Sequence, residues 1–226
     1  MVTVFRLLLL TFLCLGPMAA PSNASSAKSS VAVLQSQYGK VYASRLVAIT
    51  GMGGQPEPKA WHLFAYDLQN PSLISHFVVT GEKITEAVML DPERSKKWAA
   101  PVLAWEEVAV DTKKAFEIAD KAARLALVGF DSLDFRLMSD RRTRKPVYQL
   151  ELKDAKAKVV GYLRISAISG EILSQNWTGK PGVQMPWSGE EKIDWDIVKE
   201  EMSKVGRGIG GAFRKLGNNV RDQFKR

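Results

Sequence analysis

Cysteine is almost missing from this chain. Of its 226 residues only Cys14 carries a thiol, and histidine occurs twice. Because Cys14 lies in an apolar N-terminal stretch that we expect to be removed, the mature chain would contain no thiol. A small secreted scaffold held together by disulfides is therefore excluded. The composition, 46% hydrophobic and 25% charged, is that of an ordinary globular protein with its own core.

Apolar runs long enough to cross a membrane are also missing. Leu7–Leu15 is almost wholly apolar, but a spanning helix needs roughly 20 such residues. The run follows Met1–Arg6, which has one positive charge, and precedes Gly16-Pro17 and small residues. This is the three-part pattern of a secretory signal peptide. We expect a signal peptide over residues 1–24, cleaved after Ala20 or Ala24, and an exported protein that is periplasmic or secreted. A lipid anchor on Cys14 is disfavoured, because the residues before it are bulky.

Sequence motifs for catalysis are absent as well. The chain has no Gly-x-Ser-x-Gly elbow, no His-Glu-x-x-His helix and no phosphate loop in a valid context. Gly206-x-Gly208-x-x-Gly211 matches a dinucleotide-binding pattern, but no strand precedes it and no βαβ unit follows. We therefore expect no enzyme activity, no catalytic residues and no cofactor.

The two histidines lie on opposite arms of a predicted hairpin. His62 belongs to Trp61–Leu68 and His76 to Leu73–Thr80, so the two rings could face each other across the ladder. Such a pair could form two corners of a metal site. No third ligand lies nearby in the sequence, so ordinary strand residues are the favoured interpretation and no metal is predicted.

Alternating apolar residues predict most of the strands. Within Pro146–Leu173, Tyr148, Leu150 and Leu152 alternate with polar residues, as in a half-buried strand, and Val159–Ile168 supplies a second strand. Asp111 is a suitable N-cap for a helix over Thr112–Leu127.

The order of elements predicts an internal repeat. A helix at Val31–Ala43 and a second at Thr112–Leu127 are each followed by three predicted strands. Ile84–Trp98 is predicted to be helical, restarting at Asp91-Pro92. The predicted fold class is α+β, with two units of one helix packed on a three-stranded antiparallel sheet and a C-terminal amphipathic helix. The units are residues 31–90 and 100–178, followed by a linker at 179–189 and a tail at 190–226.

One of these units resembles a known family. Asp111–Ala123, the strand at Leu133–Leu137 and Val147–Leu173, which ends in Ser-Gly-Glu-Ile-Leu, look like a PepSY domain. The resemblance covers about Asp111–Ser174 and, more faintly, Val31–Ile84, so both units are predicted to be PepSY-like. The chain lacks the aspartate that typically precedes Gly-Glu-Ile in that family. The resemblance implies a non-catalytic binding or regulatory module of the cell envelope, of a kind that sometimes inhibits a peptidase.

The C-terminal tail combines an apolar stripe with a concentrated positive charge. Lys204–Arg226 has seven basic residues and one acidic residue, and apolar residues recur every three or four positions. Such a helix could lie on an anionic membrane, dock into a partner's groove, or fold back on its own domains. The candidate membrane- or partner-binding residues are Lys204, Arg207, Ile209, Phe213, Arg214, Lys215, Leu216, Val220, Arg221 and Phe224.

Together these features favour a binding role over catalysis. We expect an exported, non-catalytic binding or regulatory module whose partner is a peptide, a peptidase or another protein of the envelope. The first alternative is a peripheral membrane or scaffolding protein anchored by its basic tail. A second alternative is a hydrolase whose carboxylates meet only in three dimensions. A nucleic-acid partner is not expected, because no basic surface interleaved with aromatic residues is evident. The sequence does not indicate an oligomeric state.

Overall fold

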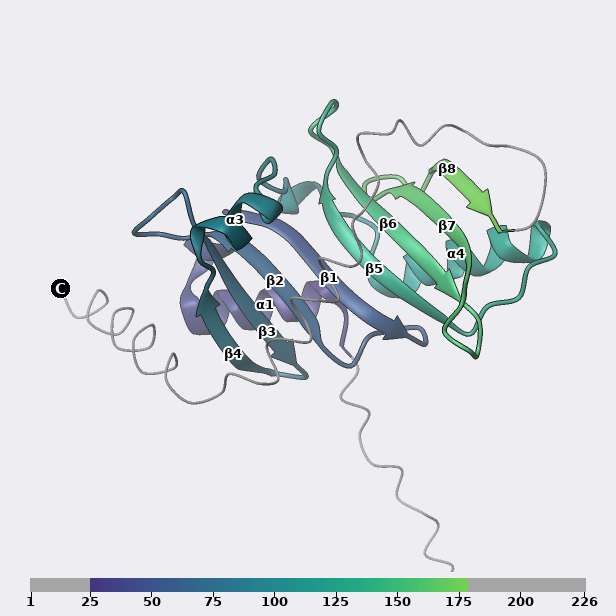
Figure 1. Ribbon diagram of the computed structural model, residues 1–226, viewed down its shortest axis with the longest axis horizontal. Coiled ribbons are helices and arrows are strands. Elements are labelled where there is room, and N and C mark those ends of the chain that lie inside the picture. The colour runs from purple at the N-terminus through teal and green to yellow at the C-terminus, as the bar shows by residue number, and fades with distance from the viewer. Residues whose placement is uncertain (1–24, 179–226) are drawn as a thin grey trace, which may run out of the picture.

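The computed structural model describes residues 25–178, whose strands form one antiparallel sheet (Figure 1). Its eight strands lie in the order β4-β3-β2-β1-β5-β6-β7-β8. The elements, in chain order, are α1 (Ala27–Tyr38), α2 (Lys40–Ala43), β1 (Leu46–Gly54), β2 (Trp61–Tyr66), β3 (Ile74–Thr80), β4 (Lys83–Met89), α3 (Pro92–Trp98), the 3₁₀ helix η1 (Trp105–Glu107), α4 (Thr112–Leu125), β5 (Ser132–Ser139), β6 (Pro146–Lys153), β7 (Val159–Ser166) and β8 (Ile172–Trp177).

The predicted fold class is wrong. The described chain is mostly sheet, and each half contributes four strands to a single eight-stranded sheet. The two strands that the sequence did not predict, β4 and β8, are the two edges of this sheet. β4 lies where a helix was expected, and it forms because pairing with β3 satisfies its backbone groups. The halves join through β1 and β5, which pair antiparallel although the paired residues are far apart in the chain, by 90 positions in Ala48↔Met138 and 86 in Thr50↔Arg136.

Two of the predicted helix starts are confirmed. The Asp111 carboxylate accepts a hydrogen bond from the Thr112 amide at 2.8 Å and caps α4. Asp91 caps α3 in the same way, accepting from the Arg94 amide at 2.9 Å, with Pro92 at the first helical position. These short polar side chains satisfy amides that have no partner inside the helix, which is why the helices begin there.

One face of the sheet packs against α1 and α4, which lie on the same side (Figure 1). Small and aliphatic residues of both helices contact the inward residues of the strands, and aromatic rings fill the space between them. Trp61, Phe77, Phe135 and Tyr148 are fully buried here. This continuous core extends across the β1–β5 junction, where the Trp61 and Phe135 rings lie 5.8 Å apart.

The opposite face has a smaller apolar cluster beneath α3. Trp98 at the end of α3 stacks on Phe64 of β2, with ring centroids 3.6 Å apart. Val47, Ile74 and Leu90 belong to the same cluster. α3 therefore covers part of β2 and β3, on the face of the sheet away from α1.

β8 is held to β7 by a close contact between a glycine and an aromatic ring. Trp177 lies opposite Gly161 in the β7–β8 ladder. A Cβ atom at Gly161 would lie 2.5 Å from the Trp177 ring, so only glycine leaves room for this packing. The contact fixes the C-terminal end of the edge strand.

Some predictions concern residues beyond the described range. The signal peptide over 1–24, the linker at 179–189 and the tail at 190–226 lie outside residues 25–178. Within residues 25–178, no helix has both the length and the apolar character needed to cross a membrane.

Replacing Phe135 with alanine tests the core that spans the junction. Phe135 is fully buried, so Phe135→Ala should lower the free energy of unfolding by about 3–5 kcal/mol in urea denaturation. Leu125→Ala is the control, because that side chain is 78% exposed and its removal should change stability by less than about 0.5 kcal/mol. Equal effects of the two changes would contradict this packing.

Candidate functional site

Polar side chains gather on the sheet face that lies away from α1 and α4. Strand alternation places Leu63, Leu137 and Leu150 in the helix-covered core, so their sequence neighbours point to the other face. Several of these neighbours are polar yet buried. They form a histidine pair over β2 and β3, and a charged cluster over β5 and β6.

The histidine pair joins two neighbouring strands. His76 lies opposite Phe64 and His62 opposite Val78, so the two histidines are diagonal neighbours on one face. His62 Nδ1 and His76 Nε2 are 3.0 Å apart and share a hydrogen bond, in which one ring donates and the other accepts. The predicted facing of the two rings is confirmed. Among residues 25–178 no group of three or more potential metal ligands exists, so the pair is not part of such a group.

The histidines continue into a stack of rings. His76 lies parallel to Phe64 with centroids 4.4 Å apart, and Phe64 in turn stacks on Trp98. The Arg136 guanidinium lies 5.3 Å from the Trp98 ring. The stack therefore extends from β3 towards β5, and burial in it disfavours the charged form of both imidazoles.

This burial shifts the acid–base behaviour of the pair. Burial lowers the pKa of His62 to about 4. Burial is the largest cause that holds the pKa of His76 well below its ordinary value of 6.5. Electrostatic repulsion from His62 and Arg94 lowers this pKa further. Both rings are therefore neutral at pH 7, which suits a structural hydrogen bond between them.

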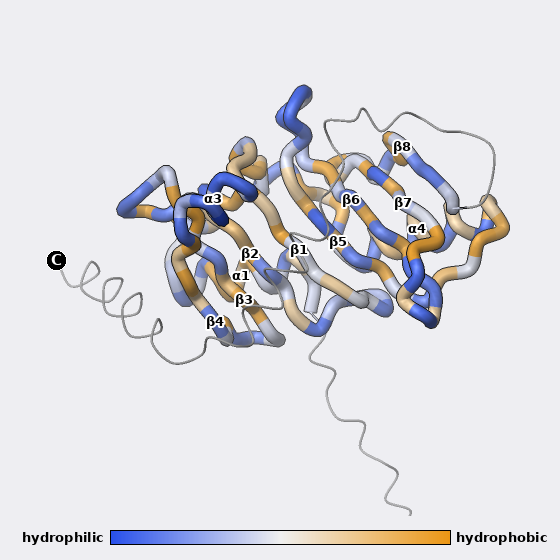
Figure 2. The backbone as a smooth tube through the Cα atoms, viewed as in Figure 1, coloured by the Kyte–Doolittle hydropathy of each residue, from blue (hydrophilic) through white to orange (hydrophobic). Residues whose placement is uncertain are grey.

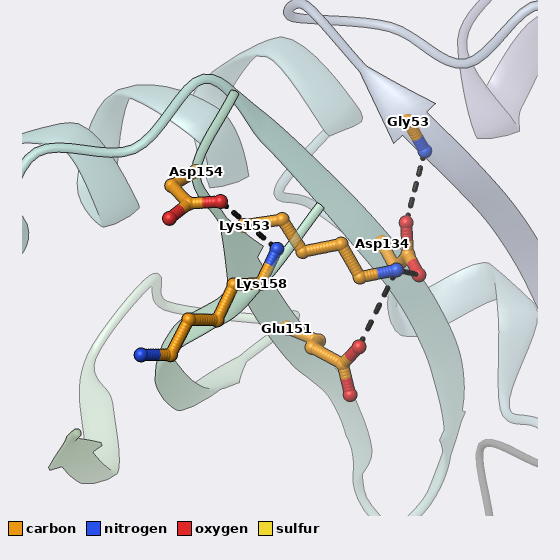
Figure 3. A network of polar contacts seen from close by, with 6 residues as sticks. All are labelled: Gly53, Asp134, Glu151, Lys153, Asp154 and Lys158. Carbon is orange, nitrogen blue, oxygen red and sulfur yellow. Dashed lines mark hydrogen bonds and ion pairs between the residues drawn. The ribbon is translucent and has the colours of Figure 1, made fainter. Parts of the chain in front are cut away.

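The charged cluster lies on β5 and β6 (Figure 3). Lys153 reaches between two carboxylates: it forms an ion pair with Asp134, and its Nζ lies 3.4 Å from Glu151 Oε1. The Gly53 amide donates a hydrogen bond to Asp134 Oδ1 at 2.9 Å, which ties the end of β1 to the cluster. All three charged side chains are at most 10% exposed. A buried lysine needs such partners, and the two carboxylates supply them from β5 and β6.

At the C-terminal edge of the sheet, β8 pairs on one side only among the described strands. Ile172–Trp177 contains neither a charged residue nor a proline. Ile172 and Leu173 are 39% and 38% exposed, although both are large and apolar. A shift of register beside Leu173 leaves Ser174–Trp177 as the regular part of the edge.

The site residues predicted from the tail lie outside the described part of the chain. They run from Lys204 to Phe224, so their role in binding stays a prediction. The charged cluster and the β8 edge were not predicted. The polar alternates of β6 were expected to be solvated, yet Gln149, Glu151 and Lys153 are all buried. Alternation places them on one face, but only the β5–β6 register brings Asp134 to Lys153.

The pH dependence of stability tests the histidine pair. As the pH falls, His62 and His76 bind protons in the unfolded chain before they do so in the folded protein, because folding lowers the pKa of both side chains. The free energy of unfolding should therefore fall as the pH drops from about 6.5 to 4, with His62 contributing about 3 kcal/mol at most.

A variant separates this effect from the titration of carboxylates. His62→Gln keeps a side chain that can form hydrogen bonds but does not titrate. Its unfolding free energy, measured in urea between pH 4 and 7.5, should decline less steeply than that of the wild type. Identical slopes would show that His62 is not buried as described.

Comparisons with known proteins show only distant similarity to a solved structure. No protein-family model matches the chain, so the resemblance to PepSY domains is not confirmed, and no curated protein matches either. A solved structure described as a "putative lipoprotein" from Clostridium difficile 630 is 13% identical, with a TM-score of 0.45. The match covers 65% of this chain and 88% of that chain. A similarity of this size supports no conclusion about function.

Proposed function

We propose that this chain is an exported, non-catalytic binding module that takes an extended peptide segment along the outer edge of β8. The observation that carries the proposal is the composition of this edge. β8 presents a row of backbone donors and acceptors without any charged residue or proline in Ile172–Trp177. Natural sheet edges are usually protected by such residues, because a bare edge pairs with other chains.

The opposite edge of the same sheet shows the contrast. β4 carries Lys83 and Glu86, and the side-chain Nε2 of Gln37 from α1 donates a hydrogen bond to the Glu82 carbonyl beside it. Charges therefore protect one edge of the sheet, whereas β8 has an uncharged edge flanked by exposed apolar side chains. This difference between two edges of one sheet favours β8 as the binding edge.

Strand addition explains how such an edge would bind. An added strand obtains its affinity from main-chain hydrogen bonds, and side-chain contacts supply selectivity. Ser174–Trp177 offers a short regular ladder, and the packing of Trp177 on Gly161 holds it in place. Ile172 and Leu173 would contact apolar side chains of the peptide. The expected ligand is an extended peptide that has aliphatic residues next to the segment that pairs with β8.

Features of the sequence support the export part of the proposal. Residues 1–24 have the pattern of a signal peptide, and Cys14 within them is the only cysteine. The resemblance of Asp111–Ser174 to PepSY domains supports an envelope binding role, and β8 begins inside that stretch.

Peptide selection and edge variants test the proposal. The full chain is used to select from a random decapeptide library, and affinity is measured by fluorescence anisotropy. Leu173→Lys should weaken binding at least tenfold, because it places a charge on the edge. Met89→Lys on β4 is the matched control, since Met89 is 51% exposed on the opposite edge, and should leave binding unchanged.

Peptide backbone chemistry gives a second test of the same claim. N-methylation on one set of alternate peptide residues should abolish binding, because those amides face β8, whereas methylation of the other set should not. If no peptide is selected, if both sets of methylated peptides bind equally, or if Met89→Lys is as harmful as Leu173→Lys, the proposal is wrong.

A further inference from the structure

The turn between β5 and β6 is strongly basic and exposed. Arg141, Arg142, Arg144 and Lys145 lie in five consecutive residues, and all are exposed. Figure 2 shows this turn as a hydrophilic projection beyond the sheet. Repulsion among four like charges disfavours a compact turn, so the backbone must be held by other contacts.

Asp140 provides those contacts. Its Oδ1 accepts hydrogen bonds from the amide and the hydroxyl of Thr143, and the Arg144 amide donates to its carbonyl at 2.9 Å. Its Oδ2 forms an ion pair with Arg164 of β7. Both carboxylate oxygens are therefore occupied in building the turn. Within residues 25–178, no acidic side chain forms an ion pair with Arg141 or Arg144.

These two arginines line an open cleft of about 600 Å³. The opposite wall is the segment Ala99–Val102, which follows α3. Two hydrogen bonds hold this wall: the Tyr66 hydroxyl donates to the Ala100 carbonyl at 2.9 Å, and the Ser139 hydroxyl to the Val102 carbonyl at 3.0 Å. The wall is apolar, and Val102 is 44% exposed.

We infer that this cleft binds a small organic anion, in which a phosphate or carboxylate group is joined to a compact apolar body. Guanidinium groups match the geometry of phosphate and carboxylate oxygens and can form paired hydrogen bonds to them. Arg141 and Arg144 take the anionic group, and Ala99–Val102 contacts the apolar part. The cleft is wide open to solvent, so the affinity would come from these two contacts and not from enclosure of the ligand. The site is separate from the β8 edge and does not depend on the peptide proposal.

The inference is tested by titrating the full chain with probes that separate charge from apolar contact. Phenyl phosphate and benzoate carry both parts, inorganic phosphate carries only the charge, and benzyl alcohol only the apolar body. Binding is followed by calorimetry and by amide chemical shifts. Phenyl phosphate or benzoate should bind at least tenfold more tightly than either partial probe, and the affinity should fall as salt is added.

Variants within the same turn supply the control. Arg141→Gln and Arg144→Gln should each weaken binding at least tenfold, whereas Arg142→Gln removes an equal charge from a residue that does not line the cleft and should have little effect. All three residues are exposed, so the variants should keep the wild-type melting temperature. The inference is overturned if Arg142→Gln weakens binding as much as Arg144→Gln. The inference is also overturned if a partial probe binds as tightly as phenyl phosphate or benzoate. It is overturned as well if neither of these two probes binds with a dissociation constant below 10 mM (about 2.7 kcal/mol).

Discussion

β1 and β5 lie side by side at the centre of the sheet, where Ile49 is opposite Leu137 and Thr50 is opposite Arg136. Each of these strands would be an exposed edge if the halves of the chain were separate. Their pairing removes both edges and continues the core beneath α1 and α4 across the junction. Among the strands of residues 25–178, β4 and β8 then lie at the two edges of the sheet.

The two faces of the sheet have different roles. The face under α1 and α4 is apolar and supplies most of the burial that stabilises the fold. The other face buries the histidine pair and the Asp134–Lys153–Glu151 cluster, whose polar groups must be matched to partners on neighbouring strands. Such groups contribute little net stability, but they favour one strand register over others. A shifted register would leave a buried polar group unpaired, which is costly. The basic turn and its cleft lie at one end of this polar face, held by Asp140 and Arg164.

Local signals in the sequence predicted local structure. The capping aspartates Asp111 and Asp91 and the facing of His62 and His76 depend on residues close in the chain, and the structure bears them out. The alternation in β6 predicted a strand correctly but not its burial on both faces. The β1–β5 junction left no local signal, because its partners are far apart in sequence. β4 and β8 were missed because edge strands bury few residues and so lack a strong apolar pattern. The charged cluster and the cleft arise only once strand register and the loop after α3 are known.

Native-state hydrogen exchange tests the central claim, that one sheet continues through β1 and β5. If the claim is right, amides of Ile49 and Leu137 exchange only by global unfolding, with the same free energy as the slowest amides of β2 and β6. Exchange of the β5–β8 amides at a clearly lower free energy, while β1–β4 stay protected, would contradict it, because the two halves would then open independently.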